Sequence, residues 1–309
     1  MATYKDIHGF KIQNVSSDPP ASFVGQVWYN TTSGDLKTNL GTPVGAWSTG
    51  GNMNTTTYER SAAGTQTATL AAGGSPKLTV TELYNGTSWT EVNDMNTGRN
   101  YAAGCGTQTA ALDIAGTPAL TTVESWNGTN WTAVNSLNSG KHGLGAAGTQ
   151  TSALGFGGYP GAKNETESWN GTNWTEVNNL NVGRGILVGA GVSNTSAMAF
   201  GGVGPQNTAT ELWNGSNWTE VNNLNSGRKA LGSAGTVTAA LAFGGNPGGA
   251  QTEIWNGTNW TNTTDMIIAQ EANIGAGSQP TAISFGGQSD GDATEEWNLT
   301  GGVSIIETS

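Results

Sequence analysis

The feature that most constrains this chain is a phrase in which an Asn-Gly pair stands between two aromatic residues. With small variations the phrase occurs five times, and a sixth, incomplete copy begins at Trp297. The first aromatic residue recurs at intervals of 42 to 44 residues. A repeat of this length indicates one supersecondary unit that is copied around an axis or along a solenoid. The aromatic residues are Tyr84 and Trp89, Trp126 and Trp131, Trp169 and Trp174, Trp213 and Trp218, Trp255 and Trp260, and lastly Trp297.

Each unit contains four strand-sized pieces that are separated by turn residues. In the unit from Gly191 to Arg228, the first piece runs into a polar turn and the second is the apolar run 196–200, which ends on Gly-Gly. The third piece ends at Trp213, and Asn214-Gly215 supplies a two-residue hairpin turn before the fourth piece starts at Trp218. Four antiparallel strands in such a unit are typical of a β-propeller blade.

The unit resembles a kelch repeat in its Gly-Gly pair, in the aromatic residue about ten positions later, in the second aromatic residue, and in its Gly-Arg ending. Gly-Gly stands at 73–74, 157–158, 201–202, 244–245 and 286–287, with Gly116-Thr117 as the one departure. The resemblance implies an all-β fold, namely a six-bladed kelch-like propeller of four-stranded antiparallel blades. It implies no particular function, because kelch-like propellers serve many unrelated roles.

The two ends of the repeat array indicate how the ring closes. No second tryptophan follows Trp297, whereas Trp47 precedes the first complete unit. We therefore expect the Trp47 strand to complete the last blade; the alternative closing strand is Val303 to Ile306. The predicted domains are an N-terminal attachment arm over residues 1–45, the propeller over 46–302, and a C-terminal tail over 303–309.

The composition narrows the possible partners. The formal net charge is −11 without any basic run, which disfavours nucleic acid as a partner. No apolar stretch approaches membrane-spanning length, and the first residues lack the apolar core of a signal peptide, so we expect synthesis in a cytoplasm without membrane insertion. Cys105 is the single cysteine, and its small apolar neighbours favour a buried core residue over a reactive thiol.

Two sets of repeated residues are expected to be structural. The paired aromatic residues could stack on sugars, but their recurrence in every blade favours packing between blades. A glutamate precedes each first aromatic residue by two positions, and a cation follows most second aromatic residues, so we expect a ring of ion pairs or turn-fixing hydrogen bonds. The glutamates are Glu82, Glu124, Glu167, Glu211, Glu253 and Glu295. The cations are Arg99, Lys141, Arg184 and Arg228, and Arg60 has the same role after Trp47. In the last unit Gln270 stands in place of a cation.

The sequence offers little that is typical of an enzyme. Its two histidines, His8 and His142, lie far apart in the pattern, so no multi-histidine metal site is expected, and no motif of a nucleophile, a phosphate loop or a zinc protease is present. Asp290 and Asp292 could bind calcium, but a solvated acidic loop is the favoured interpretation because ligand spacing is missing. We therefore expect no catalytic activity, no cofactor and no metal.

Comparison of the repeats with one another identifies a candidate binding face. The loops between strands one and two and between strands three and four are nearly constant, whereas the loops between strands two and three and the exits from strand four differ in every copy. Strand alternation places both variable sets on one face of the disc. Recognition is usually carried by loops on a rigid scaffold, although loops also drift when nothing selects them. The candidate binding residues are Lys77, Tyr101, His142, Tyr159, Lys163, Gln206, Asn207, Lys229, Asn246, Asp290 and Asp292.

The first 45 residues do not follow the repeat. An alternating apolar and polar stretch runs from Phe23 through Trp28 and Tyr29 to Lys37, and it turns at Ser33-Gly34, which predicts a small hairpin after an extended arm at Pro19-Pro20. The stretch from Pro20 to Lys37 resembles a segment of tail-fibre and other structural proteins of tailed bacteriophages. That resemblance implies attachment to a virion, with Phe23, Trp28 and Tyr29 as attachment residues.

Together these features predict a non-enzymatic virion structural protein, such as a tail fibre or another displayed appendage, present in several copies. Residues 1–45 would contact other virion proteins, and the variable face would bind a host-surface glycan or protein, or a neighbouring virion component. Two alternatives stay open: a carbohydrate-active enzyme with a central pocket, and a free-standing kelch interaction scaffold.

Overall fold

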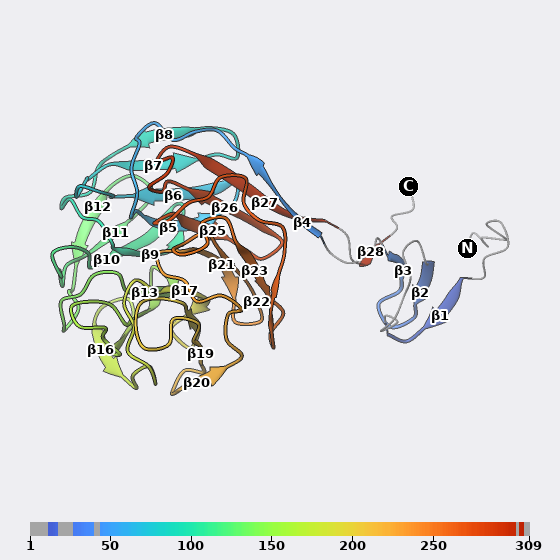
Figure 1. The fold of residues 1–309 in the computed structure, drawn as a ribbon. Helices are drawn as coiled ribbons and strands as arrows, with labels where there is room; N and C mark the ends of the chain where they lie inside the picture. Colours follow the sequence, from blue (N-terminus) through green and yellow to red (C-terminus); the bar gives the residue numbers. More distant parts are fainter. Residues whose placement is uncertain (1–11, 18–26, 40–43, 301–302, 306–309) are drawn as a thin grey trace. The chain divides into compact units, whose positions relative to one another are not determined.

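The computed structural model describes residues 12–17, 27–39, 44–300 and 303–305, and its regular elements are all strands (Figure 1). The chain divides into a large unit, Ala46–Asn298, and a small unit that combines Met1–Gly45 with Leu299–Ser309. Among the described residues, no helix is long and apolar enough to span a membrane. The predicted all-β fold with six four-stranded antiparallel sheets is confirmed.

The large unit contains six sheets, called blades 1 to 6 here, and each has four antiparallel strands. Blades 1 and 2 contain β5 (Ser61–Thr65), β6 (Ala68–Ala72), β7 (Thr81–Tyr84), β8 (Trp89–Val92), β9 (Ala103–Thr107), β10 (Ala110–Ile114), β11 (Val123–Trp126) and β12 (Trp131–Val134). Blades 3 and 4 contain β13 (Gly145–Thr149), β14 (Ser152–Phe156), β15 (Thr166–Trp169), β16 (Trp174–Val177), β17 (Val188–Ser193), β18 (Ser196–Phe200), β19 (Thr210–Trp213) and β20 (Trp218–Val221). Blades 5 and 6 contain β21 (Gly232–Thr236), β22 (Ala239–Phe243), β23 (Thr252–Trp255), β24 (Trp260–Asn262), β25 (Ile274–Gly277), β26 (Thr281–Phe285), β27 (Thr294–Thr300) and β4 (Val44–Thr49).

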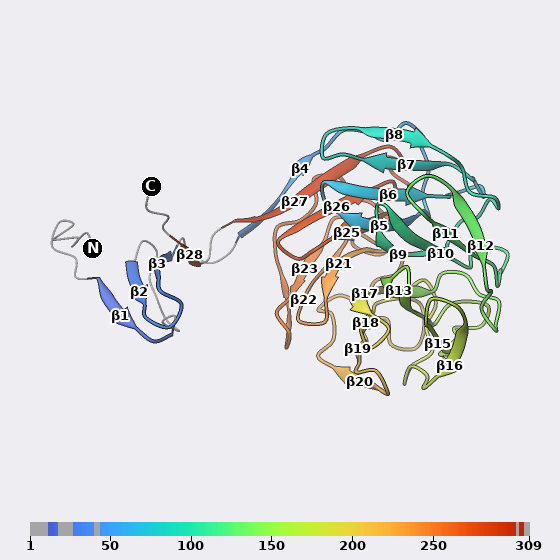
Figure 2. The same ribbon diagram turned by 180° about the vertical axis from the view of Figure 1, so that it is seen from behind.

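The six innermost strands lie next to one another in a closed ring around the axis of the large unit (Figure 2). Each of β5, β9, β13, β17 and β21 contacts the next innermost strand, and β25 contacts β5. The strands approach so closely that a Cβ atom on Gly104 would lie 2.3 Å from the carbonyl oxygen of Ala62, and one on Gly189 would lie 2.4 Å from that of Ala146. The glycine and alanine content of these strands therefore follows from their convergence at the axis.

The two ends of the large unit meet in blade 6, where β4 is the outermost strand beside β27. Trp47 lies with its ring centroid 5.4 Å from that of Trp297 and 4.9 Å from that of Phe243. The same pairing recurs within the other blades, for example between Trp126 and Trp131 at 5.3 Å. Val303–Ile305, which lies within the alternative closing segment, forms β28 and pairs with β3 instead.

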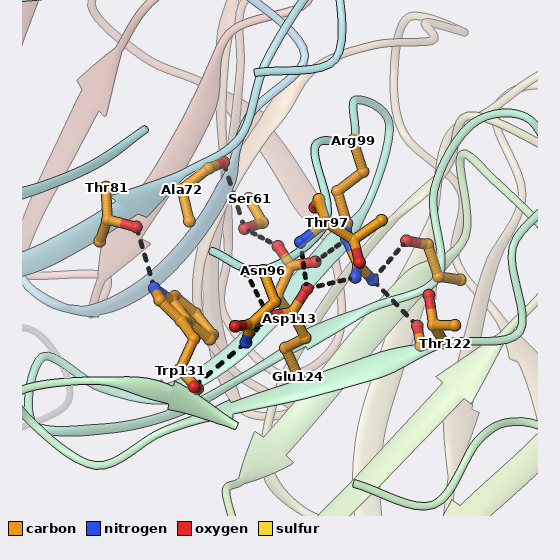
Figure 3. Close-up of polar contacts among 11 residues, drawn as sticks. Ser61, Ala72, Thr81, Asn96, Thr97, Arg99, Asp113, Thr122, Glu124 and Trp131 are labelled. Carbon is orange, nitrogen blue, oxygen red and sulfur yellow. Dashed lines mark hydrogen bonds and ion pairs between the residues drawn. The ribbon is translucent and has the colours of Figure 1, made fainter. Parts of the chain in front are cut away.

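The paired aromatic residues fill the seams between blades, and each is at most 7% exposed. The indole N–H of the second aromatic residue donates a hydrogen bond to a threonine hydroxyl on the third strand of the preceding blade, at 2.9 to 3.0 Å. The bonded pairs are Trp47–Thr252, Trp89–Thr294, Trp131–Thr81 (Figure 3), Trp218–Thr166 and Trp260–Thr210. These aromatic side chains are thus buried against protein and are not available as a platform for sugars.

One seam lacks this hydrogen bond. Trp174 belongs to blade 3, and the equivalent position on the third strand of blade 2 is the buried Val123. The indole Nε1 of Trp174 is consequently buried without a hydrogen-bond partner among the described residues. A buried donor in this state costs about 1–3 kcal/mol.

Val123→Thr is expected to stabilise the protein by about 1 kcal/mol, because the threonine hydroxyl supplies the acceptor that the indole of Trp174 lacks. The matched change Thr166→Val removes the acceptor of Trp218 and is expected to destabilise by about 1–3 kcal/mol. Urea unfolding followed by tryptophan fluorescence measures both. A less stable Val123→Thr variant would contradict this account of the seams.

The small unit is a four-stranded sheet in the order β1 (Gln13–Val15), β2 (Val27–Asn30), β3 (Asp35–Asn39) and β28. β2 and β3 form the hairpin expected from the sequence, with the turn at residues 31–34, and Trp28 is fully buried whereas Tyr29 is 38% exposed. Phe23 lies outside the described residues.

The domain limits differ from the predicted 46–302 and 303–309. The large unit ends at Asn298, and Val303–Ile305 is a strand of the small sheet rather than part of a tail. Strand β28 pairs with the second edge of β3 and so satisfies backbone groups that would otherwise be unpaired. The chain therefore passes between the two units twice.

Candidate ligand-binding face

Five of the six glutamates that recur in the repeat form buried ion pairs between adjacent blades. In each pair the cation follows the outermost strand of one blade and the glutamate lies on the third strand of the next. The pairs are Arg60–Glu82 (3.0 Å), Arg99–Glu124 (2.7 Å), Lys141–Glu167 (3.1 Å), Arg184–Glu211 (2.9 Å) and Arg228–Glu253 (2.8 Å). The second carboxylate oxygen accepts hydrogen bonds from an asparagine of the preceding blade, as Asn96 does with Glu124 at 2.8 Å. These carboxylates therefore hold neighbouring blades together.

The sixth position uses neutral partners. Glu295 accepts hydrogen bonds from the backbone N–H groups of Ile267 and Ile268 at 2.8 and 2.9 Å, and burial raises its pKa. Gln270, which stands where the other blades have a cation, donates to the carbonyl oxygen of Asp290 at 2.8 Å. The glutamine thus fixes the loop that follows β26 instead of pairing with the glutamate.

Blade 2 contains an additional buried carboxylate that the repeat comparison missed. Asp113 lies on β10 directly opposite Glu124, where the other blades have alanine, glycine or serine. Its carboxylate accepts a hydrogen bond from the hydroxyl of Ser61 and lies 3.3 Å from Nε of Arg99 (Figure 3). Arg99 is therefore shared between two carboxylates. Burial is the largest effect on Asp113 and raises its pKa to about 6, although Arg99 and Ser61 act in the opposite direction.

This carboxylate makes stability depend on pH. Its folded-state pKa of about 6 exceeds the unfolded value of about 3.9, so its contribution is fully present below about pH 4 and is lost as pH rises through about 6. The difference corresponds to about 3 kcal/mol between these limits. In Asp113→Asn we expect this loss of stability between pH 4 and 6 to disappear, as measured by urea unfolding of both proteins across that range. A wild-type stability that rose relative to the variant over this interval would contradict the assignment.

A ring of six backbone hydrogen bonds surrounds the axis at the end of the blades where the chain leaves each outermost strand. In each blade one residue with left-handed backbone donates its N–H to the carbonyl oxygen of its equivalent in the preceding blade, at 2.6 to 3.3 Å, and Glu59 closes the ring onto Ala272. The ring residues are Glu59 (φ 60°), Tyr101 (φ 54°), Gly143 (φ 58°), Ile186 (φ 51°), Ala230 (φ 51°) and Ala272 (φ 57°). Such a φ is rare for a β-branched side chain, so the ring holds Ile186 in an unfavourable conformation.

A second tier of hydrogen bonds joins the variable loops to the variable exits. The residue before each ring member accepts a backbone hydrogen bond from the loop between the second and third strands of the blade that follows, at 2.6 to 2.9 Å. The bonded residues are Ser75–Tyr58, Thr117–Asn100, Tyr159–His142, Val203–Gly185, Asn246–Lys229 and Gln288–Glu271, with the donor first. Both variable sets therefore lie on one face, around the ring; this face is called the variable face below.

Several of the candidate binding residues come together on the variable face. Tyr101, His142 and Tyr159 form a row in which the ring centroids of Tyr101 and His142 lie 6.3 Å apart and those of His142 and Tyr159 lie 5.9 Å apart. His142 and Tyr159 exchange two backbone hydrogen bonds, and so do Lys229 and Asn246.

The other candidates do not join this row. Lys77 is exposed and has a left-handed backbone, Gln206 and Asn207 are exposed, and Lys163 pairs with Glu165 at 3.0 Å. Asp292 accepts a hydrogen bond from Asn52 at 3.3 Å, and its hydrogen bond with Asp290 raises the pKa of Asp290. Among the described residues, no group of three or more histidine, cysteine, aspartate or glutamate side chains could hold a metal ion.

A cavity of about 180 Å³ lies along the axis, lined by the innermost strands and the hydrogen-bonded ring. Its walls consist mainly of glycine and alanine, and the polar lining residues are Glu59, Arg60, Tyr101, Ser233 and Asn273. Cys105 lies on this wall, and burial raises the pKa of its thiol to about 12, so the thiolate is scarce at neutral pH.

The fold defines a kelch-like six-bladed propeller. The chain is similar to the solved structure of YjhT, a kelch-repeat propeller, with a TM-score of 0.67 and 11% sequence identity; the match covers 83% of this chain and 99% of that chain. No protein-family model and no curated protein matches the sequence. Likeness at this identity supports the fold alone.

Proposed function

We propose that this chain is a non-enzymatic structural protein of a bacteriophage particle, a tail fibre or another displayed appendage. Residues 1–45 would attach it to other virion proteins, and the variable face would bind a host-surface receptor or a neighbouring virion protein. Several copies would be present in each particle.

One observation carries the binding part of this proposal. Most polar and aromatic residues that recur in the blades make contacts between adjacent blades. Trp131 donates a hydrogen bond to Thr81, and Arg99 forms an ion pair with Glu124. Residues that differ between blades gather around the hydrogen-bonded ring, on a backbone that the ring holds in place. Side-chain diversity on a rigid scaffold is what recognition of a specific partner requires.

The attachment part rests on the segment from Pro20 to Lys37 and its resemblance to phage structural proteins. In the small unit this segment supplies the hairpin of β2 and β3, in which Trp28 is buried and Tyr29 is exposed. An exposed aromatic residue on a small sheet suits a contact with another protein.

Deleting residues 1–43 separates attachment from folding, because it removes β1 to β3 but keeps β4. We expect the truncated protein to unfold cooperatively in thermal melts but to be absent from purified particles, as measured by quantitative mass spectrometry. Deleting residues 1–49 also removes Trp47 and is expected to abolish cooperative unfolding of the propeller. Incorporation of the 1–43 deletion at wild-type levels would contradict the proposed attachment role.

A further inference from the structure

The row of Tyr101, His142 and Tyr159 sets one sector of the variable face apart from the others. His142 and Tyr159 form an isolated β-bridge, and the next two blades have an equivalent bridge. The equivalent pairs are Gly185–Val203 and Lys229–Asn246, and neither contains an aromatic residue. Among the described residues of this face, the contact between three successive rings occurs in this sector alone.

These rings are held in place without being fully buried. All three are partly exposed, whereas the seam aromatic residues are at most 7% exposed. The ring of Tyr159 lies so close to the backbone of Gly185 that a Cβ atom there would be 2.2 Å from two ring carbons. Glycine at this position therefore allows the tyrosine ring to rest against the next blade.

Polar groups beside the rings are partly unsatisfied. Glu59 accepts a hydrogen bond from the amide of Asn100 at 2.6 Å. Burial and the nearby carboxylate of Glu59 raise the pKa of Tyr101. Oδ1 of Asn100 and Nδ1 of His142 are both buried and have no hydrogen-bond partner among the described residues. Burial lowers the pKa of His142, so the imidazole is neutral at neutral pH. One nitrogen of a neutral imidazole can accept a hydrogen bond. Buried acceptors of this kind are expected to receive donors from a ligand or from water.

The charges nearby select against acidic ligands. Glu59 lies within the cluster, and Glu271 acts electrostatically on Tyr101 and bonds to Asn246. Lys163, on the loop of Tyr159, is paired with Glu165, and Lys229 lies on the bridge two blades further on. The whole chain carries a net charge of −11. An uncharged ligand with hydroxyl donors and apolar ring faces would meet both the acceptors and the aromatic side chains.

Building on the proposed receptor-binding function, we propose that the sector of Tyr101, His142 and Tyr159 is a binding site for a neutral saccharide. Sugar C–H groups would pack on the rings, and sugar hydroxyls would donate to Asn100 and His142. The neighbouring carboxylate of Glu59 orients the amide of Asn100 and accepts further hydroxyl donors.

The test uses the full chain and a panel of neutral oligosaccharides built from glucose, galactose, mannose and N-acetylglucosamine, with glucuronate- and sialate-containing sugars for comparison. Saturation-transfer NMR detects binding, and calorimetry measures Kd. We expect at least one neutral sugar to bind, and Tyr159→Ala or His142→Ala to weaken it about tenfold or more. Val203→Ala, at the position equivalent to Tyr159 in the next blade, should leave Kd within about twofold. Tyr159→Phe keeps the ring and should also retain binding, which guards against an alanine variant that fails to fold.

Binding of acidic sugars alone, or binding of a neutral sugar that survives both Tyr159→Ala and His142→Ala, would overturn the saccharide site. Failure to bind any neutral sugar of the panel would also overturn it. Adsorption of the protein to host cells is measured in parallel. If wild type adsorbs to cells and the two alanine variants adsorb equally well, the receptor-binding function stands while the saccharide site falls.

Discussion

The rest of the propeller depends on the packing of one strand, β4, against blade 6. Each seam between blades is filled by an aromatic residue from the outer part of one blade and by apolar residues of the preceding blade, so every blade needs both neighbours. Trp47 supplies this contact where the array begins and ends. Burial of an indole removes about 150–250 Å² from water, which corresponds to about 4–6 kcal/mol, a large share of the stability of an ordinary domain. Without β4, Trp297 and Phe243 would lose a partner and the ring would be open.

Closure of the ring also explains why some residues of the repeat recur in every blade whereas others differ between blades. Near-identical blades need near-identical seams, and this fixes the tryptophans, the threonine acceptors, the glutamates and their cations. The axial ring of backbone hydrogen bonds uses main-chain groups, so it places almost no constraint on side chains. Glu59, Tyr101 and Ile186 can therefore occupy equivalent positions although they share no chemistry. Variation is tolerated where the backbone alone supports the fold, and this is the face on which we place binding.

Much of this architecture was predictable from local signals in the sequence. Asn-Gly between aromatic residues predicted the hairpin of the third and fourth strands, and the missing tryptophan after Trp297 pointed to Trp47. Other features of the structure could not be predicted from the sequence. A left-handed backbone at Tyr101 or Ile186 has no local signal, because among the ring positions only Gly143 is a glycine. The structure aligns Ala115-Gly116, rather than Gly116-Thr117, with the Gly-Gly pairs, because Ala115 adopts a φ of 65° that glycine adopts elsewhere. The short Val-Ser-Ile strand of β28 could not be assigned a partner, since three residues carry too little pattern to fix register.

The central claim is that closure by Trp47 makes the six blades one cooperative body. Amide hydrogen exchange of Trp47→Ala tests it most directly, with Ile267→Ala, at a side chain that is 59% exposed, as the control. The account predicts a loss of about 3–5 kcal/mol and a matching loss of protection in the core strands of all six blades, with no change in the control. Loss of protection confined to β4 and β27, with the other blades unaffected, would contradict it.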